Sequence, residues 1–192
     1  FTVPENAPDT LYYQSSAQAG MGAVLNITDT PSHSVTIAGK LRNYGQIVLP
    51  GSVLTLNNGA DLASGSLNLG KGELALSGQF TFGGGYVNTA SATLKLNDIT
   101  LVSGYLTDGL TFGDLDLNGF LLYVNYGHLT FSNAVTMDHP GDQIQVGTTI
   151  TFSGGLSVES GSISASDGKI ILGNTGSITA EGILDASSAT LE

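Results

Sequence analysis

The stretch from Leu110 to Phe152 reads LTFGDLDLNGFLLYVNYGHLTFSNAVTMDHPGDQIQVGTTITF, and its pattern decides the fold. Short apolar–polar–apolar units such as Leu110-Thr111-Phe112 recur every few residues, with Gly, Asn, Ser and Asp between them. Alternation over three residues is typical of a strand with one buried face, and the intervening residues tolerate turn geometry. No segment shows apolar residues at helical spacing, so the sequence predicts an all-β protein.

The units return in register about every 20 residues, the kind of fixed period that repeat proteins show. The first column of apolar residues contains Val35, Leu54, Leu74, Leu94, Leu115, Val135, Leu156 and Ile178. The second contains Ile47, Leu67, Val87, Leu110, Leu129, Ile150, Ile170 and Leu191. The third contains Phe80, Leu101, Leu122, Ile144, Ile163 and Ile183.

Three columns with one period predict a three-sided parallel β-helix, or β-solenoid, of about eight coils over residues 34–192. Equivalent side chains then stack inward, and Phe112, Phe131 and Phe152 form an aromatic ladder in three successive coils. The alternative fold is a β-sandwich or jelly roll, but nothing in those folds makes three columns share a period.

Residues 1–33 do not follow the period and contain Pro4, Pro8 and Pro31. We expect this segment to cap the first coil, whose strand edges are otherwise unpaired, or to donate a strand to a neighbouring subunit. Leu191 falls within a predicted strand. Either the solenoid continues in a longer protein, or this end meets the first coil of another copy and builds a head-to-tail filament.

The composition excludes several functions. With a net charge of −11 and only five lysines and arginines, the chain lacks the clustered cations that nucleic-acid binding requires, and we expect no such partner. It has no cysteine, which excludes disulfides, thiolate metal sites and a cysteine nucleophile. No apolar run is long enough to span a membrane.

Asp114 and Asp116 are the most suggestive residues for catalysis. They lie two residues apart on a predicted strand, so both point outward, and Asp108 lies nearby in sequence. Such a pair suits a glycosidase or a shallow calcium site. Acids on an outward face are more often only solvated, and the few scattered cations offer little to stabilise a developing negative charge. We therefore expect no enzymatic activity.

The loop Asp138-His139-Pro140-Gly141-Asp142 occupies the longest gap between predicted strands. Asp138, His139 and Asp142 are residue types that hold a divalent cation such as calcium. Asp, Pro and Gly are equally the residues that a long turn requires, and this structural interpretation is favoured. No other cofactor is expected.

Tyr44, Tyr86, Tyr105 and Tyr126 all come near the entry to the second column, each with glycine close by. A row of such rings along one corner of the solenoid could stack on sugars or on a neighbouring fibre. The favoured interpretation is that these rings merely cover glycine backbone.

The degenerate coils at 109–119 and 161–170 resemble filamentous-haemagglutinin-like adhesins and autotransporter passenger domains. The resemblance covers residues 34–192 and implies a right-handed β-helix exported to the cell surface. We therefore expect a non-catalytic, secreted structural protein, a surface fibre or adhesin rod that self-assembles. A carbohydrate-binding module that uses the tyrosines, or a polysaccharide-active enzyme that uses the acidic strand, are the alternatives.

Overall fold

The computed structural model describes residues 10–14, 22–26, 33–62, 65–82, 87–104, 109–165, 168–173, 176–178, 181–185 and 190–191. All regular elements in these segments are strands, and none of the described residues is helical. The all-β prediction is confirmed, because short alternating units separated by glycine and asparagine suit strands and exclude helices.

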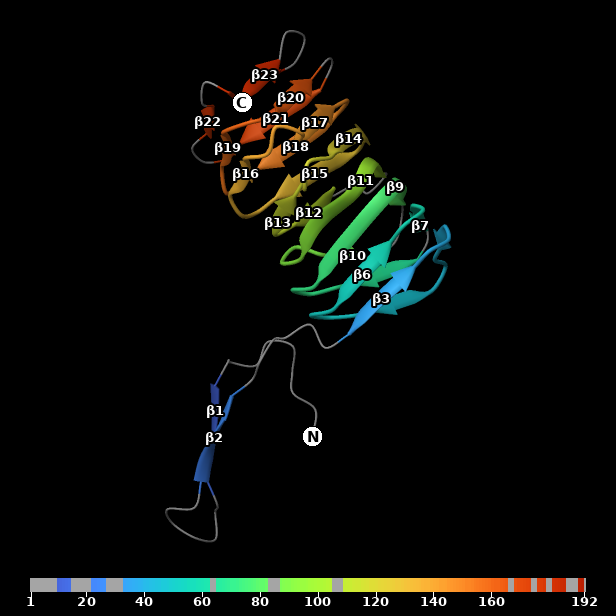
Figure 1. Ribbon diagram of the computed structural model, residues 1–192. Coiled ribbons are helices and arrows are strands. Elements are labelled where there is room, and N and C mark those ends of the chain that lie inside the picture. The colour runs from blue at the N-terminus through green and yellow to red at the C-terminus, as the bar shows by residue number, and fades with distance from the viewer. Residues whose placement is uncertain are drawn as a thin grey trace.

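The strands stack in parallel into a β-solenoid of about seven turns, and Figure 1 shows them as a long, twisted stack. The sequence suggested about eight coils. That number was too high because eight stacked positions in a column enclose only seven full circuits. The parallel pairing excludes the sandwich alternative, in which neighbouring strands run antiparallel. The right-handed sense of the winding stays a prediction.

Four sheets make up the solenoid, and every strand pair described within them is parallel. The largest contains β3 (Ser34–Ile37), β4 (Leu41–Arg42), β6 (Val53–Leu56), β7 (Ala60–Leu62), β9 (Glu73–Phe82), β11 (Thr93–Gly104), β13 (Asp114–Asp116), β14 (Leu121–Tyr126), β17 (Gln143–Val146), β20 (Ser162–Ala165) and β23 (Ile183–Asp185). The second contains β5 (Gln46–Val48), β8 (Ser66–Asn68) and β10 (Val87–Asn88).

The third sheet contains β12 (Leu110–Phe112), β15 (His128–Phe131), β18 (Thr149–Phe152), β21 (Lys169–Leu172) and β24 (Thr190–Leu191). The fourth contains β16 (Val135–Met137), β19 (Leu156–Val158) and β22 (Gly176–Ile178). From β14 onward the chain therefore visits three sheets in each turn before it returns to the first.

The register confirms most of the predicted columns. Leu110, Leu129, Ile150, Ile170 and Leu191 are successive partners, as the second column requires. The first column is also paired from Val35 to Leu115, and again from Val135 to Leu156, but the structure describes no pairing between β13 and β16. The column thus passes from the largest sheet to the fourth.

Four predicted pairings are wrong by one or two residues, and the first is that Leu122 pairs with Thr100 rather than with Leu101. Val102, rather than Leu101, is the partner of Phe80, because the register between β9 and β11 shifts between Leu96 and Thr100. Leu184, rather than Ile183, faces Ile163. Ile178 pairs with Val158 and not with Leu156. Corner length varies from turn to turn, and a slip of one residue moves a side chain to the opposite face.

The interior is filled by apolar ladders. Phe112, Phe131 and Phe152 are almost fully buried, and their ring centroids lie 6.4 and 6.0 Å apart in successive turns. The predicted aromatic ladder is confirmed. None of the buried side-chain nitrogen or oxygen atoms in the described residues lacks a hydrogen-bond partner. Stacked turns thus satisfy both the apolar and the polar groups of the interior.

Strands β1 (Thr10–Gln14) and β2 (Gly22–Asn26) form a separate antiparallel sheet with Thr10 opposite Asn26. This arrangement explains why the segment does not follow the period, since an antiparallel hairpin has no equivalent one turn later. The capping or strand-donating role expected of residues 1–33 stays a prediction.

Candidate functional site

The acidic strand β13 is tied to the turns on both sides. The Asp116 Oδ2 atom lies 3.2 Å from Nζ of Lys95, its register partner on β11. The Asn133 side-chain amide donates to Asp114 Oδ1 at 3.0 Å from the following turn. Asp108 lies outside the described residues. Both carboxylates thus have partners on neighbouring turns, as expected for outward rungs of a solenoid.

Next to β13, the stack opens into a surface hollow of about 350 Å³. On one side β13 pairs with β11, and on the other β16 pairs with β19. Hydrogen bonds still join the two turns beyond each end of the gap, from Asn133 N–H to Gly113 O and from Gln143 N–H to Phe120 O. The lining includes Asp116, Asn118, Thr136, Asp138, His139 and Asp142.

Asp142 closes one end of this hollow. Its side chain is buried, with the residue only 4% exposed. Oδ1 accepts the N–H of Gly119 from the preceding turn at 2.9 Å, and Oδ2 accepts the N–H of His139 at 3.1 Å. The Asp142 N–H in turn donates to the His139 carbonyl at 2.9 Å and closes the loop. The carboxylate therefore acts as a clamp between two turns.

The other polar residues of the loop contact the loop itself or face solvent. His139 Nδ1 accepts the N–H of Gly141 at 3.0 Å, and Asp138 is exposed. Among the residues that the structure describes, no group of three or more histidines and acids is arranged to hold a metal ion. The loop thus satisfies several of its own polar atoms, and a cation site at Asp138, His139 and Asp142 stays a prediction.

Two of the four candidate tyrosines are described, and both lie at the corner between the largest sheet and its neighbours. Tyr44 lies between β4 and β5 and is 75% exposed. Tyr126 ends β14, just before β15, and is 55% exposed. Tyr86 and Tyr105 lie outside the described residues. The structure thus places two exposed rings on this corner.

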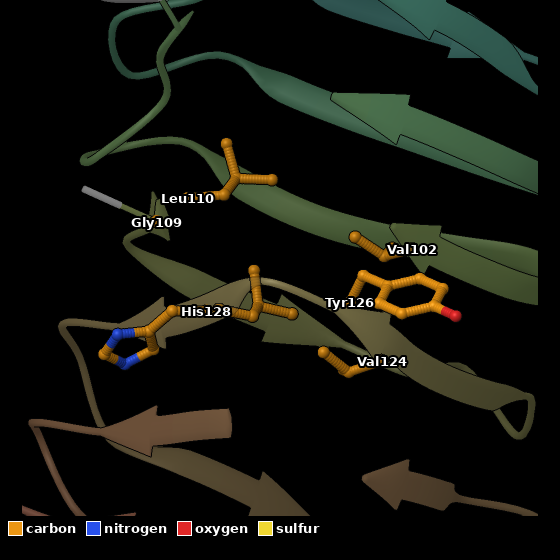
Figure 2. A pocket seen from close by; sticks show the side chains of 7 residues that line it. Val102, Gly109, Leu110, Val124, Tyr126 and His128 are labelled. Carbon is orange, nitrogen blue, oxygen red and sulfur yellow. The ribbon is translucent and has the colours of Figure 1, made fainter. Parts of the chain in front are cut away.

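Figure 2 shows Tyr126 beside a small hollow with Val102, Val124 and Leu110 around it. Its volume is about 10 Å³, which gives room for a single water molecule and not for a sugar ring. A carbohydrate would therefore have to stack on the exposed ring surface.

Two roles were not foreseen from the sequence. The buried clamp of Asp142 depends on a contact with a residue 23 positions away. His128 Nε2 lies 2.7 Å from Thr151 Oγ1 on the next strand of its sheet. Alignment of successive corners would have placed Asp142 opposite Asn118-Gly119, but it would not have indicated that the carboxylate turns inward.

Comparison of the chain with protein-family models, with curated proteins and with solved structures finds no match. Within the described segments, no helix has the length and apolar character needed to cross a bilayer.

Proposed function

We propose that this protein is a non-catalytic structural rod of an extracellular or cell-surface fibre or adhesin. The observation that carries the proposal is the ladder of equivalent side chains that continues from turn to turn, with Phe112, Phe131 and Phe152 as its aromatic part. A solenoid built in this way gains stability from each added turn, which suits an extended stalk.

The outward faces support the same proposal. They carry small polar residues that also form ladders: Asn88 donates to Asn68 at 3.0 Å, and the hydroxyls of Ser157 and Ser177 lie 3.0 Å apart. Only 11% of the chain is charged, so uncharged polar residues of this kind make up most of the polar surface.

Self-assembly through strand pairing is the second part of the proposal. β3 pairs with β6 on one edge, where the carbonyls of His33 and Ile37 accept N–H groups from the next turn. Thr36, at the alternate position, directs its N–H to the opposite edge. Val35 and Ile37 are only partly buried, so the first rung offers both apolar surface and backbone groups to another copy.

Electron microscopy and sedimentation of the purified chain at rising concentration test this assembly. We expect short rods that lengthen into filaments, and Thr36→Pro should shorten them because proline has no N–H to donate. Thr36→Ala is the matched control and should still assemble. Monodisperse short rods at every concentration would reject self-assembly, and compact particles would reject the rod. Antibody labelling of intact source cells tests the surface location.

A carbohydrate-binding module is a second candidate because Tyr44 and Tyr126 are so exposed. The double substitution to alanine should abolish glycan binding if the rings stack on sugars, while the double substitution to phenylalanine should retain it. A polysaccharide-active enzyme has less support, since Asp114 and Asp116 are both held by neighbours. Turnover that is lost in Asp114→Asn with Asp116→Asn would establish it.

A further inference from the structure

The sequence contains two Asn-Gly pairs, and both lie at the same corner of the solenoid. Both asparagines are exposed, and both glycines have a positive φ, +73° at Gly59 and +81° at Gly119. Each asparagine side chain donates to a carbonyl of the preceding turn, Asn58 to Ala38 at 2.9 Å and Asn118 to Leu96 at 3.3 Å. The two pairs thus share a corner, a positive-φ glycine and a side-chain contact, but the asparagine backbones differ, since Asn118 has a φ of +52° and Asn58 is not in the positive-φ region.

They differ in the group that accepts the glycine N–H. Gly59 N–H donates to the backbone carbonyl of Ser77 at 2.8 Å. Gly119 N–H instead donates to the Oδ1 atom of Asp142 at 2.9 Å. A carboxylate is a proton acceptor, whereas an amide carbonyl takes up a proton only in strong acid. The carboxylate is also buried and held in place by His139 N–H.

We propose that Asn118-Gly119 is a self-modifying site, at which Asp142 is the general base for deamidation of Asn118. The Gly119 nitrogen gives its proton to Asp142 and bonds to Cγ of Asn118. The Cγ–Nδ2 bond then breaks, and ammonia leaves with the proton that the carboxylate had accepted. Water opens the resulting succinimide at either carbonyl and leaves aspartate or isoaspartate.

The product changes the corner. Asn118 loses the amide that donates to Leu96 O, and a new carboxylate appears close to Asp142. In the isoaspartate product the main chain also gains one carbon, which alters the turn that Gly119 makes. The modified fraction therefore increases with the age of the protein, and in modified molecules the contact between the two turns beside the hollow between β13 and β16 is weaker.

The test is the rate of deamidation at Asn118 and Asn58 in the same folded protein, incubated at neutral pH and followed by tandem mass spectrometry with isoaspartate detection. General-base catalysis contributes upward of about 100-fold in enzymes, so we expect Asn118 to react at least about tenfold faster than Asn58. In urea, where both sites lose their partners, the two rates should converge. A folded ratio no greater than the ratio in urea would overturn the proposal.

Asp142→Asn sharpens the test, because an amide oxygen still accepts the Gly119 N–H but is far less basic. Asn118 should then slow to about the rate of Asn58, while Asn58 itself is unchanged. If the substitution instead loosens the fold, deamidation should accelerate at both Asn118 and Asn58. In that case the test is the ratio of the two rates in the folded wild-type protein. Asn118 reacting at the wild-type rate, with Asn58 unchanged, would overturn the role of Asp142.

Discussion

The corner between the first-column and the third-column strands is built in two different ways along the solenoid. In β9 the strand runs through the corner at Ser77–Gly78 without interruption, and pairs with both β6 and β7. Gly78 has a φ of +93°, which lets the chain bend within the strand. In a later turn, the loop 138–142 separates β16 from β17, and β16 lies in the fourth sheet with β19 and β22.

This difference shows what replaces a backbone ladder when it is interrupted. Between β13 and β16, where the structure describes no strand pairing, the Asp142 carboxylate accepts N–H groups from both turns. A longer corner thus exchanges backbone hydrogen bonds for side-chain ones. The interior ladder continues through both arrangements, so substitutions in the ladder, the tight corner, the clamp and an exposed rung should differ in their effect.

The largest effect is expected from the interior. Phe131→Ala removes the middle ring of the stack between Phe112 and Phe152, and a buried Phe→Ala change costs about 3–5 kcal/mol of unfolding free energy. Urea denaturation should show this loss. Thr130→Ala, on the outward face of the same strand, should change stability by no more than about 0.5 kcal/mol. Equal losses of stability would contradict the assignment of Phe131 to the buried face and Thr130 to the outward face of the strand.

The tight corner should be the next most sensitive. At Gly59 an added Cβ would meet the Gln79 carbonyl oxygen, and the residue has a φ of +73°. Gly59→Ala should therefore cost about 3 kcal/mol, the upper end of the range for a strained backbone. Gly39→Ala is the control one turn earlier, since its Cβ would meet nothing within 4 Å. Thermal melts should therefore show a clearly lower Tm for Gly59→Ala than for Gly39→Ala.

The clamp should matter less than either. Asp142→Ala leaves the part-buried N–H groups of Gly119 and His139 without their acceptor, which costs about 2 kcal/mol. Hydrogen exchange should accelerate at residues 117–120 and 138–143 before it does elsewhere. Asp138→Ala removes the same charge from an exposed position of the same loop and should have little effect. Protection that is unchanged at 117–120 would show that the clamp is dispensable.

The smallest effect is expected at the exposed rung. Lys95 and Asp116 are 33% and 45% exposed, so loss of their ion pair should cost at most about 1 kcal/mol. Lys95→Met keeps most of the aliphatic stem and isolates the charge. The stability difference from the wild type should shrink further at high salt, because ions screen exposed pairs. A larger, salt-independent loss would show that Lys95 contributes through packing.

Much of the fold could be predicted from the sequence, and the errors lie at the corners. Stacked turns need equivalent residues at nearly equal intervals, so the period of about 20 residues indicated the aromatic ladder and the parallel pairing. The same argument failed at Leu101, Ile178 and Ile183, because a fixed step cannot anticipate a corner that gains one or two residues. At the candidate site, the sequence left open whether the tyrosines are exposed; Tyr44 and Tyr126 are exposed, and the function of these rings stays a prediction.

The sequence by itself determined most of the side chains that point inward and that equivalent ones recur once per turn, because alternation and period are properties of the chain alone. Only the tertiary structure decided how the turns hold one another at the corner of Asp142. Its partner Gly119 is distant in sequence, and an aspartate in a loop looks the same whether it faces water or two backbone N–H groups. Which of these it faces depends on corner length and on the turn stacked next to it, and no local pattern encodes either.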